Sequence, residues 1–165
     1  MRTFMESIEA EYRRYRSLAE MTFDQLTDEQ LIAPAPGAAS SIATIARHLA
    51  GNLRSRFTDF LATDGEKPWR DRESEFEVRT PGREDLLEDW NSGWEVLTST
   101  LGSLADANLV DTVTIRGEEL SVIRALHRSL AHTAYHVGQI VDRGKELQGE
   151  AWEYLSIPPG GSIDV

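Results

Sequence analysis

Cysteine is absent from this chain of 165 residues. A protein thiol is needed for a disulfide framework, a thiolate zinc site, an iron–sulfur cluster and a cysteine nucleophile, so the sequence excludes all four. Any thiol chemistry must therefore use a thiol that enters as a cofactor or substrate. A metal ion must be bound through histidine or carboxylate side chains.

Basic residues and long apolar runs are also scarce. The chain has 17 Lys and Arg residues against 28 Asp and Glu residues, which gives a formal net charge of −11. Nucleic-acid binding is driven by clustered basic residues that displace counterions, so this balance argues against a nucleic-acid partner. No run reaches the roughly 18 apolar residues that span a bilayer, and the N-terminus lacks the features of a secretory signal. We therefore expect a cytoplasmic protein that does not engage a membrane.

Apolar residues recur at three- and four-residue steps in four long stretches, which predicts an all-α protein. The long helices are expected over residues 2–21, 40–61, 83–104 and 121–147, with a short helical turn within 23–32. The apolar stripe of the second long helix comprises Ile42, Ile45, Leu49, Leu53, Phe57 and Phe60. Four amphipathic helices of this length are typical of an antiparallel four-helix bundle, here expected as one domain over residues 1–165.

The connections between these helices differ in character. Residues 64–82 are polar and charge-dense and predict a long loop, with a lid as one interpretation. Residues 113–120 predict a small hairpin or tight turn before the last helix. The C-terminal segment from Trp152 to Val165 contains Pro158 and Pro159, which cannot continue a helix. We expect an extended tail anchored by Trp152.

Three of the four histidines fall on the predicted last helix. His132 and His136 differ by four residues, about 40° around a helix, so both rings leave the same face. His127 lies about 180° from His136 and is excluded as a partner of this pair. His48 lies roughly 120° from the apolar stripe of the second helix, on its flank. Two helices packed side by side would bring His48, His132 and His136 together.

Three neutral imidazoles suit Zn, Ni, Fe or Cu and leave at least one coordination position open, which is typical of a catalytic rather than a structural site. Asn52 and Gln139, one turn after His48 and His136, are candidates to orient ligands or substrate. A solvated histidine pair is an equal alternative on spacing alone. The HExxH pattern of zinc proteases is absent, because Thr133 stands where its Glu would be.

Other residue types receive plainer interpretations. His127 is expected at the surface or in a helix interface, and Trp90 and Trp94 in the core. Arg47, Arg54 and Arg56 are expected on a solvated face, with one of them as an alternative receiver of an anionic substrate group.

Two helical segments and the tail resemble a known family. The segments are Ile42-Ala43-Thr44-Ile45-Ala46-Arg47-His48-Leu49, Arg128-Ser129-Leu130-Ala131-His132-Thr133-Ala134-Tyr135-His136-Val137-Gly138-Gln139-Ile140 and Leu155-Ser156-Ile157-Pro158. This pattern resembles the DinB-like superfamily, which includes the YfiT-type bacillithiol transferases and mycothiol-dependent maleylpyruvate isomerase. The resemblance implies a four-helix bundle, a homodimer, and a divalent metal held by His48, His132 and His136. It also implies a low-molecular-weight thiol that binds the metal as a thiolate and transfers its sulfur to an electrophile.

Three functions follow from these observations. The first is a metal-dependent thiol S-transferase acting on a small-molecule substrate, with Zn or Ni as the expected ion and Fe as an alternative. The second is a hydrolase that uses metal-activated water. It lacks a placed general base, because Asp59 lies about 16 Å along the helix from His48. The third is a non-catalytic, metal-stabilised dimer that binds a partner or small ligand under stress.

Overall fold

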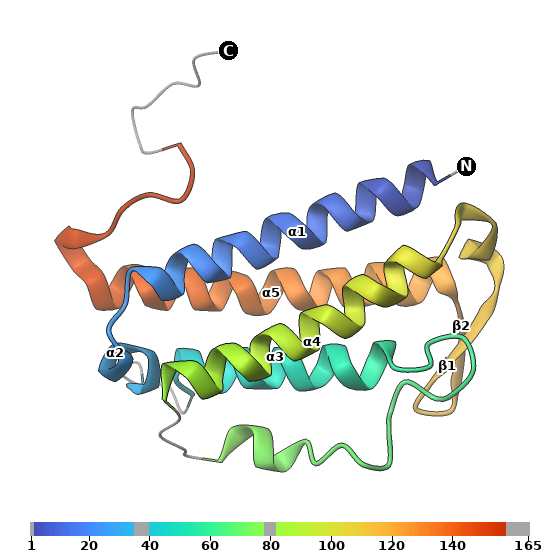
Figure 1. Ribbon diagram of the computed structural model, residues 1–165, viewed down its shortest axis with the longest axis horizontal. Helices are drawn as coiled ribbons and strands as arrows, with labels where there is room; N and C mark the ends of the chain where they lie inside the picture. Colours follow the sequence, from blue (N-terminus) through green and yellow to red (C-terminus); the bar gives the residue numbers. More distant parts are fainter. Residues whose placement is uncertain (1, 35–39, 78–81, 158–165) are drawn as a thin grey trace.

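The computed structural model describes residues 2–34, 40–77 and 82–157 (Figure 1). The chain is mostly helical, as predicted. Its α-helices are α1 (Thr3–Asp24), α2 (Asp28–Ile32), α3 (Ile42–Phe57), α4 (Arg83–Ser103) and α5 (Val122–Gln148). Short 3-10 helices are η1 (Glu73–Phe76), η2 (Asp106–Val110) and η3 (Gly149–Ala151), and strands β1 (Thr112–Ile115) and β2 (Glu118–Ser121) form a two-stranded sheet.

Polar side chains fix the starts of two helices. Thr27 precedes α2 and forms a capping box: its hydroxyl accepts the backbone N–H of Gln30, whose side chain accepts the Thr27 N–H. Ser41 accepts the N–H of Thr44 at 3.1 Å and begins α3. α3 ends at Phe57, earlier than the predicted end at residue 61, because the backbone turns away there and Asp59 adopts a positive φ of 47°.

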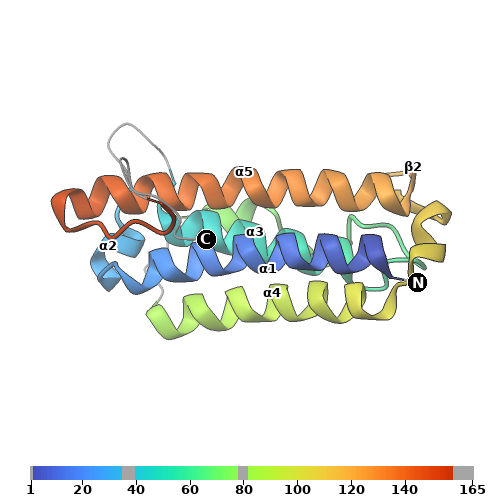
Figure 2. The ribbon, with the colours of Figure 1, turned by 90° about the horizontal axis from the view of Figure 1, so that it is seen from above.

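Seen from above, the four long helices lie side by side (Figure 2). α3 and α4 run in the same direction. Ala50 of α3 meets Gly93 of α4, and further toward the C-terminus of both helices the Thr100 hydroxyl donates to the Phe57 carbonyl at 2.9 Å. The expectation of antiparallel neighbours is therefore wrong for this pair. The physical reason is the connection after α3, whose described part over residues 58–77 returns along α3 (Figure 1).

A second pair, α1 and α5, also runs in one direction. Phe4 contacts His127 near the start of both helices, and Thr22 contacts Gly144 near the end of both. By contrast, α3 and α5 run in opposite directions, because Ser40 before α3 accepts a hydrogen bond from Arg143 late in α5. This antiparallel contact sets the two histidine-bearing helices against each other.

The core lies where the four apolar stripes meet. Every residue of the predicted α3 stripe is buried. Trp90 and Trp94 are fully buried, which confirms their predicted place in the core, and they meet Phe23 and Tyr12 of α1 in edge-to-face contacts at 5.3 and 6.2 Å.

The connecting segment of residues 58–77, called the crossover segment below, is more than the polar loop that the sequence predicts over residues 64–82. It contains η1, and the side chains of Lys67, Arg70 and Glu75 are buried. The Lys67 ammonium donates to the Thr63 hydroxyl at 2.6 Å and to the Asp64 carbonyl at 2.5 Å. These charges are tolerated because each is paired or hydrogen-bonded. The segment therefore packs on α3, where Arg47 and His48 bond to Glu75.

The predicted hairpin is present and is tied to the crossover segment. Arg116 and Gly117 form its two-residue turn with positive φ values of 56° and 76°. The Asp64 carboxylate accepts the backbone N–H groups of both residues at 2.8 Å. The backbone hydrogen bond from Glu66, followed by those from Gly117 and Arg116, lowers the pKa of Asp64. The hairpin and the crossover segment are thereby held together.

The C-terminal segment leaves α5 through η3 and has no helix in its described part. The Trp152 ring packs over Gly144 of α5, where a side chain on the glycine would meet the ring at 3.2 Å. Trp152 therefore anchors the tail as expected. Pro158 and the residues after it lie outside the described residues.

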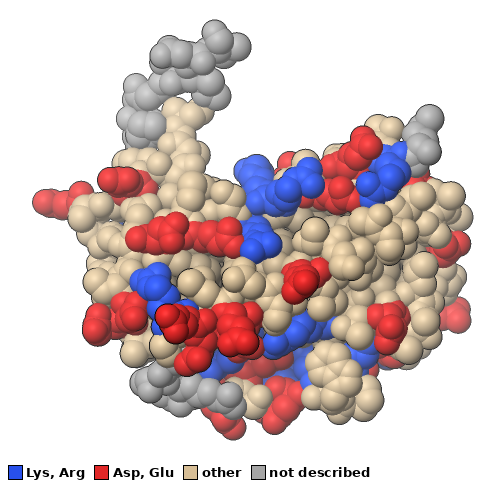
Figure 3. Space-filling view, viewed as in Figure 1, with Lys and Arg blue, Asp and Glu red and all other residues tan. Residues whose placement is uncertain are grey.

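Two surface properties bear on partners. None of the helices in the described ranges combines the length and apolarity that crossing a membrane requires. Acidic and basic side chains are interspersed over the face shown in Figure 3. That face offers no broad basic area of the kind that follows a nucleic-acid backbone.

The contact between α3 and α4 predicts the effect of one substitution. A Cβ at Gly93 would lie 2.7 Å from Ala50 backbone atoms, so Gly93→Ala must push the helices apart. We expect a loss of about 1–3 kcal/mol in unfolding free energy, measured by urea denaturation. Gly102→Ala on the same helix meets no atom within 4 Å and should stabilise the protein by up to about 1 kcal/mol. Equal behaviour of the two variants would contradict the close approach.

Candidate metal centre

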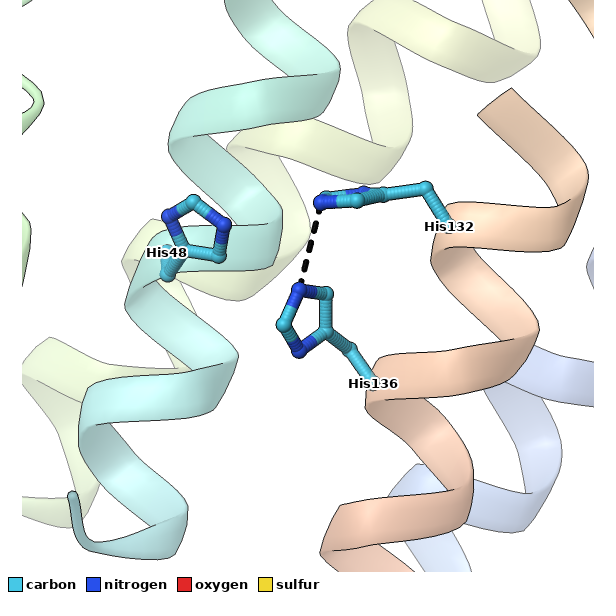
Figure 4. A group of neighbouring side chains, drawn as sticks. All are labelled: His48, His132 and His136. Carbon is cyan, nitrogen blue, oxygen red and sulfur yellow. Dashed lines mark hydrogen bonds between the residues drawn. The ribbon is translucent and has the colours of Figure 1, made fainter. Parts of the chain in front are cut away.

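The imidazoles of His48 on α3 and of His132 and His136 on α5 converge in the space between the two helices (Figure 4). One ring nitrogen from each residue lies within 4.8 Å of the others. The two Nε2 atoms of His132 and His136 are 3.2 Å apart. The structure therefore brings together the three residues that the helical angles selected, and they are close enough to hold a metal ion.

The packing of α5 explains why this pair faces α3. Thr133, Val137 and Ile140 are buried and turn one stripe of the helix into the core. His132 and His136 occupy the flank of that stripe and are partly buried. His48 is buried on the facing side of α3. The arrangement follows from two amphipathic helices packed side by side in opposite directions.

A carboxylate from the crossover segment fixes the His48 ring. Nδ1 of His48 is 2.7 Å from Oε2 of Glu75, which leaves Nε2 as the nitrogen available to a ligand. The Arg70 guanidinium holds Glu75 in turn, donating from Nε to Oε1 at 2.8 Å and from Nη2 to Oε2 at 2.9 Å. Gly51 makes room for this carboxylate, because a Cβ there would lie 2.3 Å from Oε1.

Glu75 is ionised in this arrangement. Burial, the largest single influence, raises the pKa of its carboxyl, but hydrogen bonds from His48 and Arg70 and the charge of Arg70 together lower that pKa below its ordinary value. An ionised Glu75 accepts the Nδ1–H of His48. This fixes the tautomer in which Nε2 of His48 carries a free lone pair.

Gln139 does the same for His136. Its side-chain oxygen lies 2.8 Å from Nδ1 of His136 and accepts the proton there, while its amide nitrogen donates to the Tyr135 hydroxyl at 3.3 Å. The candidate orienting role of Gln139 thus has a matching contact. Asn52 is buried beside the group, but no hydrogen bond joins it to the three rings among the residues described.

His132 completes the donor set as a neutral ring. Burial above all, followed by the charges of His136 and His48, lowers its pKa to about 3. Its Nδ1 is buried and has no hydrogen-bond partner in the described part of the chain. Burial also lowers the pKa of His136. Neutral imidazole is the form that ligates metals, so the chemistry of the three rings fits a divalent cation.

A pocket of about 340 Å³ adjoins two of the three histidines, His48 and His132. His48, His132 and Asn52 form part of its wall, and Phe57, Phe60 and other residues of α3, α5, the hairpin and the crossover segment complete it. The volume falls within the range of small-molecule sites. A ligand in this pocket would have direct access to the histidine group.

The comparisons with known proteins give a family without an assigned activity. A family model described as a protein of unknown function, DUF1572, matches residues 1–161. The chain belongs to the DUF1572 family. No curated protein and no solved structure matches it. The function of this DUF1572 protein therefore has to be argued from its site.

Sequence reasoning missed two residues of the site in this DUF1572 chain. Glu75 and Arg70 lie in a charge-dense segment that has no helical period, so no signal separated them from its exposed acidic and basic residues. His127 lies outside the group, as the helical angles predict: it is exposed, and its ring packs against Phe4 at 5.6 Å.

The prediction that the arginines of α3 lie on a solvated face is wrong in part. Arg47 donates to the backbone carbonyls of Glu75 at 3.0 Å and Glu77 at 2.9 Å. The Arg56 side chain is only 12% exposed. The reason is that the crossover segment covers this side of α3.

Replacing Glu75 should weaken metal binding. Glu75→Gln removes the charge that fixes the His48 tautomer, and such outer contacts are worth about 10–100-fold in metal affinity. We expect a Zn²⁺ dissociation constant raised by about tenfold in competition titrations with a chromogenic chelator. Glu73→Gln is the matched control, because Glu73 lies in the same 3-10 helix and is 87% exposed. An unchanged affinity in Glu75→Gln would contradict the anchoring role.

The lowered pKa of His132 predicts acid sensitivity of the metal-free protein. The folded state favours the neutral ring, whereas the unfolded chain binds a proton below its ordinary pKa of 6.5. This contribution to stability is full above pH 6.5 and is lost as the pH falls toward 3. His132→Gln should reduce the proton uptake on unfolding, seen as a shallower pH dependence of the unfolding free energy. Identical slopes for the two proteins would contradict this.

Proposed function

We propose that this DUF1572 protein binds one divalent metal ion and uses it to transfer a low-molecular-weight thiol to an electrophilic small molecule. The convergence of three imidazoles from α3 and α5, two of which (His48 and His132) line a pocket, carries the proposal. Zn and Ni suit such a nitrogen set best, and Fe is the alternative. Three protein ligands leave a coordination position for a substrate.

The chemistry assigned to the ion is thiol activation. When bound, a divalent cation lowers the pKa of a coordinated thiol from about 8.5, so that a thiolate forms at neutral pH. The chain has no cysteine, so the thiol must be a cosubstrate such as bacillithiol, mycothiol or glutathione. In the transfer, a sulfur–carbon bond forms, the thiol proton is released, and the leaving group departs with its bonding electrons.

The protein's own residues orient and shield the reaction. Glu75 and Gln139 hold His48 and His136 in the tautomers that point a lone pair toward the ion. Phe57 and Phe60 contribute apolar surface to the pocket and limit water beside the histidines. The residues thus orient the ligand rings and position a substrate.

The resemblance to the DinB-like superfamily supports the same assignment. We place the four long helices in that superfamily as a four-helix bundle, with α1 and α5 running one way and α3 and α4 the other. On the same basis, we propose a cytoplasmic homodimer.

Hydrolysis has less support from the site. Both carboxylate oxygens of Glu75 accept hydrogen bonds from Arg70, and Oε2 also contacts Nδ1 of His48. Its lowered pKa makes it a weak base. A carboxylate so engaged does not serve as the general base that metal-activated water requires.

Elemental analysis and a thiol-transfer assay test the proposal together. The untagged protein, loaded with Zn²⁺ or Ni²⁺, should hold about one ion per chain and conjugate glutathione, bacillithiol or mycothiol to monochlorobimane. His48→Ala and His132→Ala should lose the ion and at least about 100-fold in rate, since each removes a ligand. His127→Ala is the control, because this exposed histidine lies outside the group.

Two results would overturn the proposal in different ways. No bound ion after loading would reduce the three histidines to packing residues. A stoichiometric ion without turnover of any of the three thiols would favour a non-catalytic metal-stabilised protein.

A further inference from the structure

The pocket beside the histidines is lined with positive charge. Five arginines and no Asp or Glu appear among the described residues of its wall, in a protein of net charge −11. They come from four parts of the fold: Arg56 from α3, Arg70 and Arg72 from the crossover segment, Arg116 from the hairpin turn, and Arg128 from α5. This concentration contrasts with the mixed charge of the face in Figure 3.

Two of these arginines are committed to the fold. Arg70 is 3% exposed and forms the fork that holds Glu75. Arg56 donates to the Gly65 carbonyl at 2.5 Å and to the Glu66 carboxylate at 3.0 Å. Their guanidinium groups still contribute positive charge to the wall, but their hydrogen-bonding capacity is largely used.

Arg128 has hydrogen-bond donors available for a ligand and lies on the same face of α5 as the histidine pair. It lies four residues before His132, so Arg128, His132 and His136 share one face of α5 at successive turns. Its nearest carboxylate oxygen, on Glu118, is 3.8 Å away, beyond hydrogen-bond distance, and both side chains are more than half exposed. Such an exposed, loose pair contributes little and is readily exchanged for a better anion.

Arg116 supports Arg128 from the hairpin. One of its nitrogens pairs with Glu66 at 2.6 Å, and its side chain is 55% exposed. A guanidinium has five N–H donors, so this pairing leaves donors for a ligand. The hydrogen bonds from its turn to Asp64 hold its backbone in place.

The rest of the wall suits a carbon skeleton with a polar end. Phe57, Phe60, Ile115 and Ala125 supply apolar surface. Ser129, a buried polar residue, also lines the pocket.

We infer that the pocket binds the anionic end of a small organic substrate, a carboxylate or phosphate group, through Arg128 and Arg116. Guanidinium groups bind both kinds of oxyanion by paired, charge-assisted hydrogen bonds. His48 and His132 form part of the same wall, so the other end of the molecule reaches the histidine group. That second statement depends on the proposed function, whereas binding of the anion does not.

Isothermal titration calorimetry on the metal-free protein at low ionic strength tests the inference. Succinate and inorganic phosphate represent the two oxyanions, and succinamide is the uncharged control. The wild-type protein should bind at least one anion and not succinamide. Arg128→Gln and the double variant with Arg116→Gln should bind at least about tenfold more weakly, the loss expected for a charged hydrogen bond. The tighter of the two anions identifies the substrate's acidic group.

Arg124→Gln controls for net charge. Arg124 lies one turn before Arg128 on α5, is exposed, and is not among the residues that line the pocket. It removes the same charge and should leave binding unchanged. Equal weakening in Arg124→Gln and Arg128→Gln, or no anion binding by the wild-type protein, overturns the inference. Circular dichroism melting of each variant shows that the fold is retained.

These outcomes separate the inference from the proposed function. If anion binding is lost only in the Arg128 and Arg116 variants and neither the wild type nor any variant transfers a thiol, the proposed function alone is contradicted. If the wild-type protein transfers a thiol but binds neither anion, the inference alone is contradicted.

Discussion

The site depends on the close packing of α3, which is held on three sides. Ala50 lies against the bare backbone of Gly93 in α4, and Gly51 accommodates the Glu75 carboxylate from the crossover segment. His48 faces α5 on the third side. Two small residues next to each other therefore let a neighbouring helix and a buried carboxylate approach α3 within a turn of His48. The close approach of α4 and the contact with the Glu75 carboxylate together hold that ring in position.

The long helices and the shared face of His132 and His136 could be predicted from the sequence, because both depend on local helix geometry. A helix advances about 100° per residue, so the spacing of His132, His136 and His127 fixed which rings share a face without knowledge of the fold. The same periodicity located the long helices and their buried stripes. Helix direction could not be predicted, since α3 and α4 run parallel because the crossover segment returns along α3, and no periodicity records that path.

The wrong predictions for residues of the site also arise from the crossover segment, whose path the sequence does not reveal. Amphipathic reasoning assigns a charged residue to solvent unless another element covers it. Arg47 and Arg56 are covered because the crossover segment packs on their side of α3, and their donors meet backbone carbonyls and Glu66. Glu75 was missed for the complementary reason, as it looks in sequence like its exposed neighbour Glu73. Burial of a charge becomes tolerable only with partners that tertiary structure supplies.

The charge distribution selects among possible ligands by size. The protein as a whole is acidic, so an extended polyanion laid across its surface would meet repulsion over most of its length. A small anion inside the pocket is different, because fields from surface charges are screened over about 8 Å at physiological salt, whereas Arg128 and Arg116 lie in the wall itself. His132 in the same wall has a lowered pKa and adds no charge at neutral pH, whereas a bound metal ion would add positive charge that attracts the same anionic molecules. An acidic exterior around a basic pocket thus favours compact acids over nucleic acids, and this is the chemistry expected of a small-molecule site.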